Sequence, residues 1–497
     1  MKEGYLSIVL HTHMPYVRKN GTWPVGEDWL YQVMSETYIP LLEMLERVHS
    51  QNITSCLTLD ITPVLCEQLS DSFIKERFIE YLKTMIKHTK KDIQDFKYFG
   101  DFKRKEIAEI WLLEYEKKLE KFLSIDSEII GSFGSLEKEG VIEIMGSCAT
   151  HAFLPGLKDL KAVERQVKLG VEAHIKHFGS RPKGFWVPEC AWRDELTEIL
   201  EREEIEYVLL DYSAIYGKPT TIPYRIEKSS IILFARSKTA HENVWNPTNG
   251  YPTDSNYLDT TKYYLNSGNH YWKVTGKDVP IEKKLTYDHE KANAKTLEHA
   301  LHFLDASYKE IDSAPNENDS PVVIASFDSE LFGHGWYEGI RWLETVIRSC
   351  FESKRVNLTT PSDYLRTNPR VSPVFVQTPT SWGDGNDYST WLNDKTYWMW
   401  NELEKVEKEF IALESRYGKN SKELTLRALS QAKREVLLLE SSDWFYMVAK
   451  NRASNYAIER FRNHIERFRM IAETIENGKL DISGAMLEEF EDIDRLF

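Results

Sequence analysis

Short apolar runs that alternate with helical stretches constrain the fold of this chain more than any other feature. Seven runs have the length and apolar content of buried strands, at residues 5–10, 54–59, 142–144, 184–187, 207–210, 231–235 and 322–327. Apolar residues at helical spacing lie between several of these runs, at residues 30–49, 160–177 and 195–203. Strands that alternate with helices predict an α/β protein with a parallel sheet.

Polar residues follow the predicted strands at the points where the strands end. They are His11, His13, His151, Glu189, Asp211 and Asp328. In a closed β/α barrel the carboxyl ends of the strands meet at one face, and that face carries the chemistry. We therefore expect residues as distant in sequence as His11 and Asp328 to share one site.

Two further regions are helical without strands. Residues 63–136 are dense in Lys and Glu, and long amphipathic helices are expected there at 73–87 and 105–122. After about residue 378 the pattern is helical to the end, with helices expected at 397–415, 421–439 and 456–477. The predicted domains are a discontinuous catalytic barrel at 1–62 and 137–377, a helical insertion domain at 63–136, and a C-terminal helical domain at 378–497 that completes the cleft.

The charge and the cysteine pattern exclude several classes of partner. The formal net charge is −15, which opposes binding to nucleic acids and to anionic lipid surfaces, whereas a neutral polysaccharide is indifferent to it. The apolar run at 5–10 is shorter than the core of a secretory signal, and no run approaches the ~20 residues of a membrane span. Five cysteines without CxxC spacing support neither a disulfide framework nor a zinc ribbon. We expect a cytoplasmic protein with no nucleic-acid and no membrane partner.

Two carboxylates stand out at the ends of different predicted strands. Glu189 lies between Pro188 and Cys190 and is flanked by Trp186 and Trp192, which is unusual for a solvated glutamate. Asp and Ser at the start of a segment can cap a helix, but Asp328 begins a segment that also holds Glu330, His334 and Trp336 around two glycines, which favours a functional site over a cap. A pair of carboxyl groups suits glycosidic cleavage, in which one attacks the anomeric carbon and the other protonates the leaving oxygen.

Two alternatives from other classes remain open on this reasoning. His11-Thr12-His13 places alternate side chains on one face, so the two histidines could chelate a metal with His151, Asp211 or His334 as a third ligand. That arrangement would favour a metal-dependent polysaccharide deacetylase, whereas hydrogen-bonding histidines would not. A non-catalytic glucan-binding protein would share the barrel and its aromatic platforms but would not need two placed carboxylates.

Five short segments carry a specific combination of residues. They are His11-Thr12-His13-Met14-Pro15-Tyr16, Ala149-Thr150-His151-Ala152-Phe153-Leu154-Pro155, Trp186-Val187-Pro188-Glu189, Asp328-Ser329-Glu330-Leu331-Phe332-Gly333-His334 and Thr360-Pro361-Ser362-Asp363-Tyr364-Leu365. Together they resemble the motifs of glycoside hydrolase family 57, specifically its branching-enzyme-like and α-amylase-like members. Further family-like stretches include Ser381-Trp382-Gly383 and Ser441-Ser442-Asp443-Trp444. The likeness extends over nearly the whole chain.

This resemblance implies an incomplete (β/α)7 barrel with a helical insertion and a C-terminal all-α domain. It implies a retaining double displacement on α-1,4-glucans such as amylose, glycogen and malto-oligosaccharides, with Glu189 as nucleophile and Asp328 as general acid/base. It implies no metal and no cofactor, so the motif histidines become sugar-binding groups, and we expect a monomer. The candidate substrate-binding residues are His11, His13, His151, Trp29, Arg236, Trp272, His334, Trp336, Trp382 and Trp391.

The segment 212–224 departs from the family pattern. Efficient branching members carry a longer loop here, with a tyrosine at its tip, and Tyr216 or Tyr224 could partly substitute for that residue. The histidine usual after an Asp211-type residue is replaced by Tyr212-Ser213, and Ser237 replaces the usual acidic neighbour of Arg236. Because a short loop should exclude water less well, the expected activity is dominated by hydrolysis, with weak α-1,6 transfer. The alternative is a fully competent 1,4-α-glucan branching enzyme.

Overall fold

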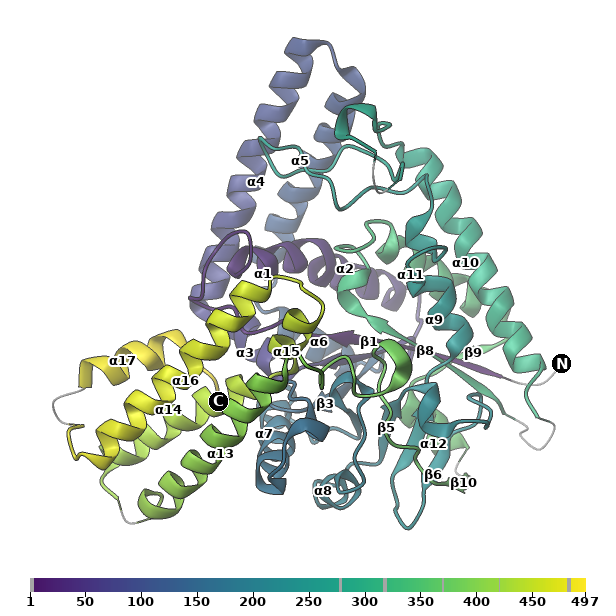
Figure 1. The fold of residues 1–497 in the computed structure, drawn as a ribbon. Helices are drawn as coiled ribbons and strands as arrows, with labels where there is room; N and C mark the ends of the chain where they lie inside the picture. The colour runs from purple at the N-terminus through teal and green to yellow at the C-terminus, as the bar shows by residue number, and fades with distance from the viewer. Residues whose placement is uncertain (1–3, 277–278, 316–319, 369–370, 420, 481–483) are drawn as a thin grey trace.

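A curled parallel sheet forms the centre of the computed structural model, which describes residues 1–497 except 1–3, 277–278, 316–319, 369–370, 420 and 481–483 (Figure 1). Its strands lie in the order β7 (Ile232–Ala235), β5 (Tyr207–Leu210), β4 (Gly184–Trp186), β3 (Ile142–Ser147), β2 (Leu57–Ile61), β1 (Tyr5–Thr12) and β8 (Val322–Asp328). Every strand expected from the sequence is present. The seven parallel strands form the incomplete (β/α)7 barrel that the family resemblance implied.

The two outer strands of this barrel, β7 and β8, are not paired with each other in the described part of the chain. Instead β6 (Tyr224–Ile226) pairs antiparallel with β7, and β10 (Ser372–Val374) extends the sheet beyond β6. On the other side β9 (Asn357–Leu358) pairs with β1. Backbone hydrogen bonds still link the two sides of the gap: the N–H of Ser237 donates to the carbonyl of Ile324 at 2.7 Å, and the N–H of Val322 donates to the carbonyl of Thr221 at 3.0 Å.

Helices cover the outside of the sheet. They are α1 (Glu27–Val33), a π-helical turn (Met34–Tyr38), α2 (Ile39–His49), α7 (Leu160–Phe178), α8 (Leu196–Arg202), α9 (Lys238–Trp245), α10 (His289–Asp312), α11 (Gly339–Ser353) and α12 (Pro361–Thr367). The long helix α10, which the sequence reading did not anticipate, runs along one side of the molecule in Figure 1. Within the described ranges, no helix has both the length and the apolarity needed to cross a membrane.

Between β2 and β3 the chain forms four helices: α3 (Pro63–Ser70), α4 (Ser72–Phe99), α5 (Phe102–Ser124) and α6 (Ile129–Lys138). Helices α4 and α5 project from the barrel as a long hairpin (Figure 1). The hairpin turns at Gly100, whose φ of 72° ends α4, and Asp101 caps α5 by accepting a hydrogen bond from the N–H of Arg104 at 3.1 Å. Helix α4 runs past the predicted bound of 87 because Gly100 terminates it, and α5 ends at Ser124, just past the predicted bound of 122.

The C-terminal region consists of α13 (Tyr397–Tyr417), α14 (Glu423–Leu439), α15 (Ser442–Ala449), α16 (Ser454–Glu476) and α17 (Gly484–Ile493). The short helices α15 and α17 were not expected from the sequence. These helices share a hydrophobic core with the second half of the barrel, in which the ring of Phe153 stacks on Trp391 with centroids 4.8 Å apart. Arg460 of α16 donates to the carbonyl of Tyr16 at 2.8 Å, which fixes the region against the segment that follows β1.

Candidate active site

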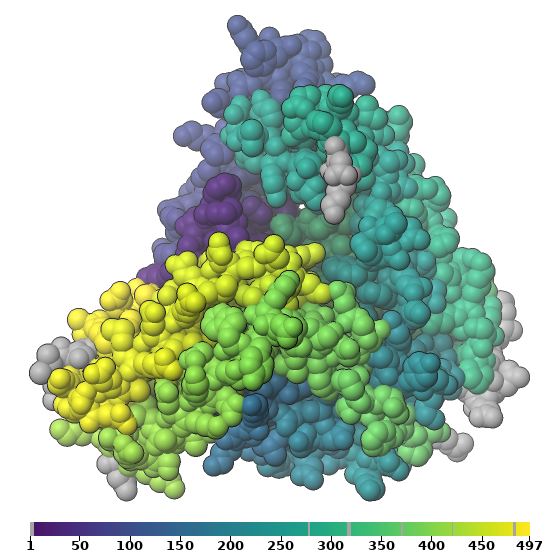
Figure 2. Space-filling view, viewed as in Figure 1, coloured from purple at the N-terminus to yellow at the C-terminus, as the bar shows by residue number. Residues whose placement is uncertain are grey.

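A cavity of about 1270 Å³ opens at the carboxyl ends of the parallel strands. Figure 2 shows a hollow in the surface where the yellow C-terminal helices meet the purple N-terminal segment and the teal segment above them. Of the residues singled out in the sequence, those that line the cavity are His11, His13, Trp29, His151, Glu189, Arg236, Asp328, His334, Trp382 and Trp391. The chain therefore brings together both candidate carboxylates and all of the motif histidines.

Glu189 lies in the 3₁₀ turn Pro188–Cys190 that follows β4 and is held in an unusual backbone conformation. Its φ is 60° and that of Cys190 is 51°, values that non-glycine residues rarely adopt except where surrounding contacts enforce them. Its Oε2 accepts a hydrogen bond from Trp382 Nε1 at 2.8 Å, and its Oε1 accepts one from Ser442 Oγ at 2.8 Å. Burial raises the pKa of Glu189 to about 7, although both hydrogen bonds act to lower it. The carboxyl group is thus fixed in position and titrates near neutrality.

Ser442 continues this hydrogen-bonding chain to His151. The hydroxyl of Ser442 donates its only proton to Glu189, so at 2.9 Å it must accept from Nδ1 of His151. This assigns the imidazole proton to Nδ1 and leaves Nε2 as an acceptor. Nε2 is buried and has no partner among the described residues. Burial, together with the charges of His13 and His11, holds the pKa of His151 well below its ordinary value. The ring is therefore neutral, and its Nε2 can accept a hydrogen bond from a hydroxyl group of a ligand.

Asp328 ends β8, where it stands in register with His11 of the neighbouring strand β1. Burial raises its pKa to about 6, and the nearby positive charges of His13 and Arg236 limit the increase. Two residues further on, Glu330 accepts hydrogen bonds from Tyr38 Oη at 2.6 Å and from the backbone N–H of His13 at 3.2 Å. Burial raises the pKa of Glu330 to about 8. The site therefore holds two carboxyl groups on β4 and β8 and a third beside Asp328.

His11, His13 and His151 form a stack of imidazole rings. The centroids of His13 and His151 are 4.0 Å apart with an interplanar angle of 23°, and those of His11 and His151 are 4.8 Å apart at 27°. His11 Nδ1 pairs with Asp60 Oδ2 at 2.5 Å, and His13 Nε2 bonds both carboxylate oxygens of Asp443 at 3.1 Å.

This stacking bears on the metal alternative. Ligand atoms of His13, His151 and Asp443 lie within 4.8 Å of one another, which is close enough for a metal site. However, the lone pair of an imidazole nitrogen lies in the ring plane, and two nearly parallel stacked rings cannot both direct in-plane lone pairs at one ion. The cluster is better suited to hydrogen-bonding sugar hydroxyls than to tetrahedral zinc.

Arg236 and Asp211 form a buried pair at one wall of the cavity. Arg236 Nε contacts Asp211 Oδ2 at 2.5 Å, and Asn386 Nδ2 donates to Asp211 Oδ1 at 3.0 Å. Asp211, which is fully buried, therefore orients Arg236 and does not coordinate with the histidines. The guanidinium lies beside the ring of Trp382, 5.8 Å from its centroid.

The structure places two of the tryptophans predicted to bind sugar outside the cavity. Trp272 and Trp336 are only 6% and 1% exposed, and neither lines the cavity. Trp336 packs against Tyr257 and Trp342, with centroids 5.3 and 5.6 Å away, so its ring belongs to the core beneath His334. His334 itself reaches the cavity and pairs with Glu36, Nδ1 to Oε2, at 2.6 Å.

The two tyrosines considered as loop substitutes differ in environment, and neither lines the cavity. Tyr224 lies in β6, is 5% exposed, and donates its hydroxyl to the carbonyl of Pro219 at 3.1 Å. Packing in the sheet thus excludes Tyr224 from a mobile tip, and that assignment is wrong. Tyr216 follows a 3₁₀ turn and is 86% exposed, so only this residue is free to move toward a ligand.

The sequence reading missed several residues that line or support the cavity. Ser442 and Asp443 were noted only as part of a family-like stretch, and their capping pattern at the start of α15 was the available signal. Trp23, Trp245 and Tyr263 line the cavity and are 76%, 41% and 53% exposed. Trp23 and Tyr263 lie in loops and Trp245 ends α9, and the sequence pattern does not encode how these segments pack around the cavity.

Two family models match the parts of the chain that form this site. The family model "Glycosyl hydrolase family 57" matches residues 7–379, and the model "1,4-alpha-glucan branching enzyme, C-terminal" matches residues 402–497. The 1,4-alpha-glucan branching enzyme TK1436 of Thermococcus kodakarensis is 34% identical over 532 residues, which covers 100% of this chain and 77% of the relative.

Solved structures agree with this match. The GH57-type branching enzyme of Pyrococcus horikoshii superposes with a TM-score of 0.93 at 35% identity, covering 99% of this chain and 95% of the other. The alpha-amylase AmyC of Thermotoga maritima superposes with a TM-score of 0.88 at 30% identity, covering 100% and 98%.

Proposed function

Because the chain belongs to glycosyl hydrolase family 57 and is a branching-enzyme-like enzyme that acts on α-glucans, we propose that it is a 1,4-α-glucan branching enzyme. Its substrates would be α-1,4-glucans such as amylose, glycogen and malto-oligosaccharides. The reaction would cut an α-1,4 bond and transfer the released chain to a 6-hydroxyl. We also propose that it acts as a monomer, which sizing combined with light scattering would test.

The proposed mechanism is a double displacement. A Glu189 oxygen attacks C1 of the donor sugar as the C1–O4 bond breaks, and Asp328 gives its proton to the departing O4. In the second half, Asp328 takes the proton from the 6-hydroxyl of the acceptor, whose oxygen attacks C1 and releases Glu189. His151 Nε2 would accept a hydrogen bond from a hydroxyl of the sugar held between the two carboxyl groups, since that nitrogen has no partner in the described part of the protein.

The single observation that best supports this proposal is the double hydrogen bond to Glu189. One donor, Trp382 Nε1, lies in the loop before α13, and the other, Ser442 Oγ, lies in the region matched by the branching-enzyme C-terminal model. A surface glutamate would not need two aligned donors, whereas a nucleophile must be held within a narrow range of positions. A non-catalytic binder has no use for this arrangement.

Hydrolysis is the second candidate outcome of the same mechanism. The expectation of an enzyme dominated by hydrolysis has less support than its alternative, because the family model that matches residues 402–497 is that of branching enzymes, and the relatives from Thermococcus kodakarensis and Pyrococcus horikoshii are branching enzymes. Two observations still favour it: the likeness to an α-amylase, and the segment 212–224, which brings no tyrosine to the cavity. Water and the 6-hydroxyl would compete for the same glycosyl-enzyme.

The test is to incubate the protein with amylose and to count two products. New reducing ends report hydrolysis, and short chains released afterwards by a debranching enzyme report α-1,6 transfer. We expect transfer to exceed hydrolysis, and Glu189→Gln and Asp328→Asn each to abolish both products. Hydrolysis alone would establish the second candidate. Substantial activity in either variant would refute the assignment of the two carboxyl groups.

A further inference from the structure

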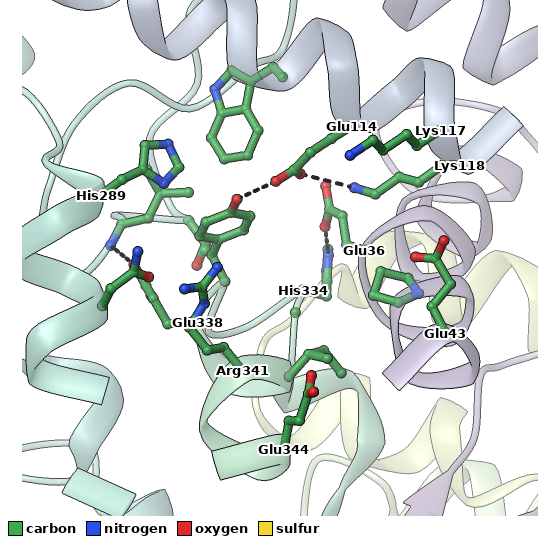
Figure 3. A pocket seen from close by; sticks show the side chains of 18 of the residues that line it. Glu36, Glu43, Glu114, Lys117, Lys118, His289, His334, Glu338, Arg341 and Glu344 are labelled. Carbon is green, nitrogen blue, oxygen red and sulfur yellow. Dashed lines mark hydrogen bonds and ion pairs between the residues drawn. The ribbon is translucent and has the colours of Figure 1, made fainter. Parts of the chain in front are cut away.

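A second cavity of about 710 Å³ lies beside the catalytic cleft (Figure 3). Its size falls within the ~300–1,000 Å³ typical of small-molecule sites. Four helices present residues to it at helical spacing: α5 contributes Trp111, Glu114, Tyr115 and Lys118, α11 contributes Arg341, Glu344, Thr345 and Arg348, α10 contributes His289 and Asn293, and α2 contributes Pro40, Glu43 and Arg47. A hollow built from four helices is a stable feature of the fold.

The cavity and the cleft share one wall. Glu36, Tyr115, Thr260, His270 and His334 line both of them. The centre of this wall is the pair of His334 Nδ1 and Glu36 Oε2, 2.6 Å apart, and Figure 3 shows the pair between His289 and Glu338 on one side and Lys118 and Glu43 on the other. His334 belongs to the segment that begins with Asp328. A ligand in the second cavity would therefore sit next to the catalytic segment.

The charges around the cavity select against an ionic ligand. Its lining holds five acidic residues, Glu36, Glu43, Glu114, Glu338 and Glu344, and five basic ones, Arg47, Lys117, Lys118, Arg341 and Arg348. Several are already paired, since Glu344 contacts Arg47 at 2.6 Å and Arg348 at 2.6 Å. A phosphate or a nucleotide would need a clear excess of cations, which this lining lacks. The ligand that fits is neutral.

The lining combines aromatic surface with unmet hydrogen-bonding capacity. The rings of Trp111 and Tyr337 pack edge to face, with centroids 4.8 Å apart, at one end of the cavity. Among the described residues, Glu338 Oε2 and His289 Nε2 are buried polar atoms without a partner, and Glu338 is only 3% exposed. Buried polar atoms normally have partners, so a pair of them at one wall points to a ligand that supplies hydroxyl groups.

We propose that this second cavity binds a short segment of α-glucan, as a saccharide site separate from the catalytic cleft. A neutral ligand with apolar ring faces and hydroxyl edges matches the balanced charge, the aromatic surface and the unpaired polar atoms. The identity of the sugar polymer as α-glucan rests on the proposed function. In a transfer reaction two chains must be held at once, and a site that shares a wall with the cleft keeps the second chain close to the glycosyl-enzyme.

Binding without turnover tests the proposal. Maltoheptaose is titrated calorimetrically into Glu189→Gln and into the same variant with Asn293→Trp, which fills the cavity from the half-buried position one turn after His289 on α10. The matched control is Ala294→Trp, because its neighbour Ala294 is exposed and lines neither cavity. We expect two binding sites per chain in the parent and in the control, and one in Asn293→Trp. One site in all three proteins would overturn the proposal.

A crystal structure of Glu189→Gln with maltoheptaose gives an independent measurement should the filled variant fail to fold. Sugar density between α5 and α11 is the expected result, and density confined to the cleft at saturating ligand would refute the second site. The branching assay on the wild type separates this inference from the proposed function. Branch formation without a second site refutes the inference alone, whereas a second site without cleavage of amylose refutes the proposed function and leaves the cavity as a glucan site.

Discussion

Removing the hydroxyl of Ser442 should weaken catalysis by shifting a proton between the two carboxyl groups proposed to be catalytic. In Ser442→Ala, Glu189 Oε1 loses the hydrogen bond that Ser442 donates at 2.8 Å, while the bond from Trp382 to Oε2 remains. A hydrogen bond to a charged group contributes about 1.5–3 kcal/mol, and one pKa unit corresponds to about 1.36 kcal/mol. The pKa of Glu189 should therefore rise by roughly 1–2 units.

The sign of the effect follows from the protonation state that the mechanism requires. Glu189 must be ionised and Asp328 protonated, so the productive pair holds one proton. Burial raises the pKa of Glu189 to about 7 and that of Asp328 to about 6, so the two carboxyl groups compete for this proton. A further increase in the pKa of Glu189 drives the proton away from Asp328, and kcat/KM should fall about 10- to 100-fold.

The assay is the pH dependence of kcat/KM on a malto-oligosaccharide. Because Glu189 has the higher pKa of the pair, the alkaline limb of the profile should move up by roughly 1–2 units while the maximum falls. The control is Ser307→Ala in α10, whose buried hydroxyl donates to the carbonyl of Phe303 at 2.9 Å and does not line the cavity. An unchanged alkaline limb in Ser442→Ala, with the protein folded, would refute the role of Ser442 in holding Glu189.

Two further predictions concern stability around the shared wall. Gly333→Ala should destabilise the protein by at least about 2 kcal/mol, because its φ is 106° and a Cβ would lie 1.9 Å from the carbonyl oxygen of Glu36. Gly140→Ala, at φ 72° with open space around it, should cost less, and equal losses in chemical denaturation would contradict the clash. Glu330→Gln should stabilise the protein at alkaline pH only. The native state of the wild type binds the Glu330 proton more tightly than the unfolded state does, since burial raises its pKa from 4.5 to about 8, so wild-type stability falls as pH rises through that interval. The gain in Tm should be small at pH 5 and clear at pH 9, and equal gains at both would show that Glu330 does not titrate in this range.

Residues at strand ends were the part of the site that sequence could predict. Glu189 and Asp328 each follow an apolar run, and parallel strands carry whatever follows them to one face regardless of separation along the chain. Tryptophan identity was a poorer guide. Trp336 and Trp382 have the same chemistry and similar glycine-rich neighbours, yet Trp336 is 1% exposed in the core while the indole of Trp382 bonds Glu189. Packing of the surrounding chain decides between these roles, and periodicity does not encode it.

The contribution of the C-terminal helices could not be derived from local pattern at all. Ser442 and Asp443 begin a short helix, and only the docking of that helix brings them to His151, Glu189 and His13. Hydrogen bonds far from the cavity hold this docking in place. The carbonyl of Tyr16 accepts a hydrogen bond from Arg460, and the hydroxyl of Tyr16 donates one to the carbonyl of Ile493 at 3.1 Å. The segment after β1 is thereby fixed by the last helices of the chain. Glu189, the serine that bonds it and the histidine stack thus depend on both ends of the chain, so the region after residue 402 is part of the candidate active site and not an appendage to it.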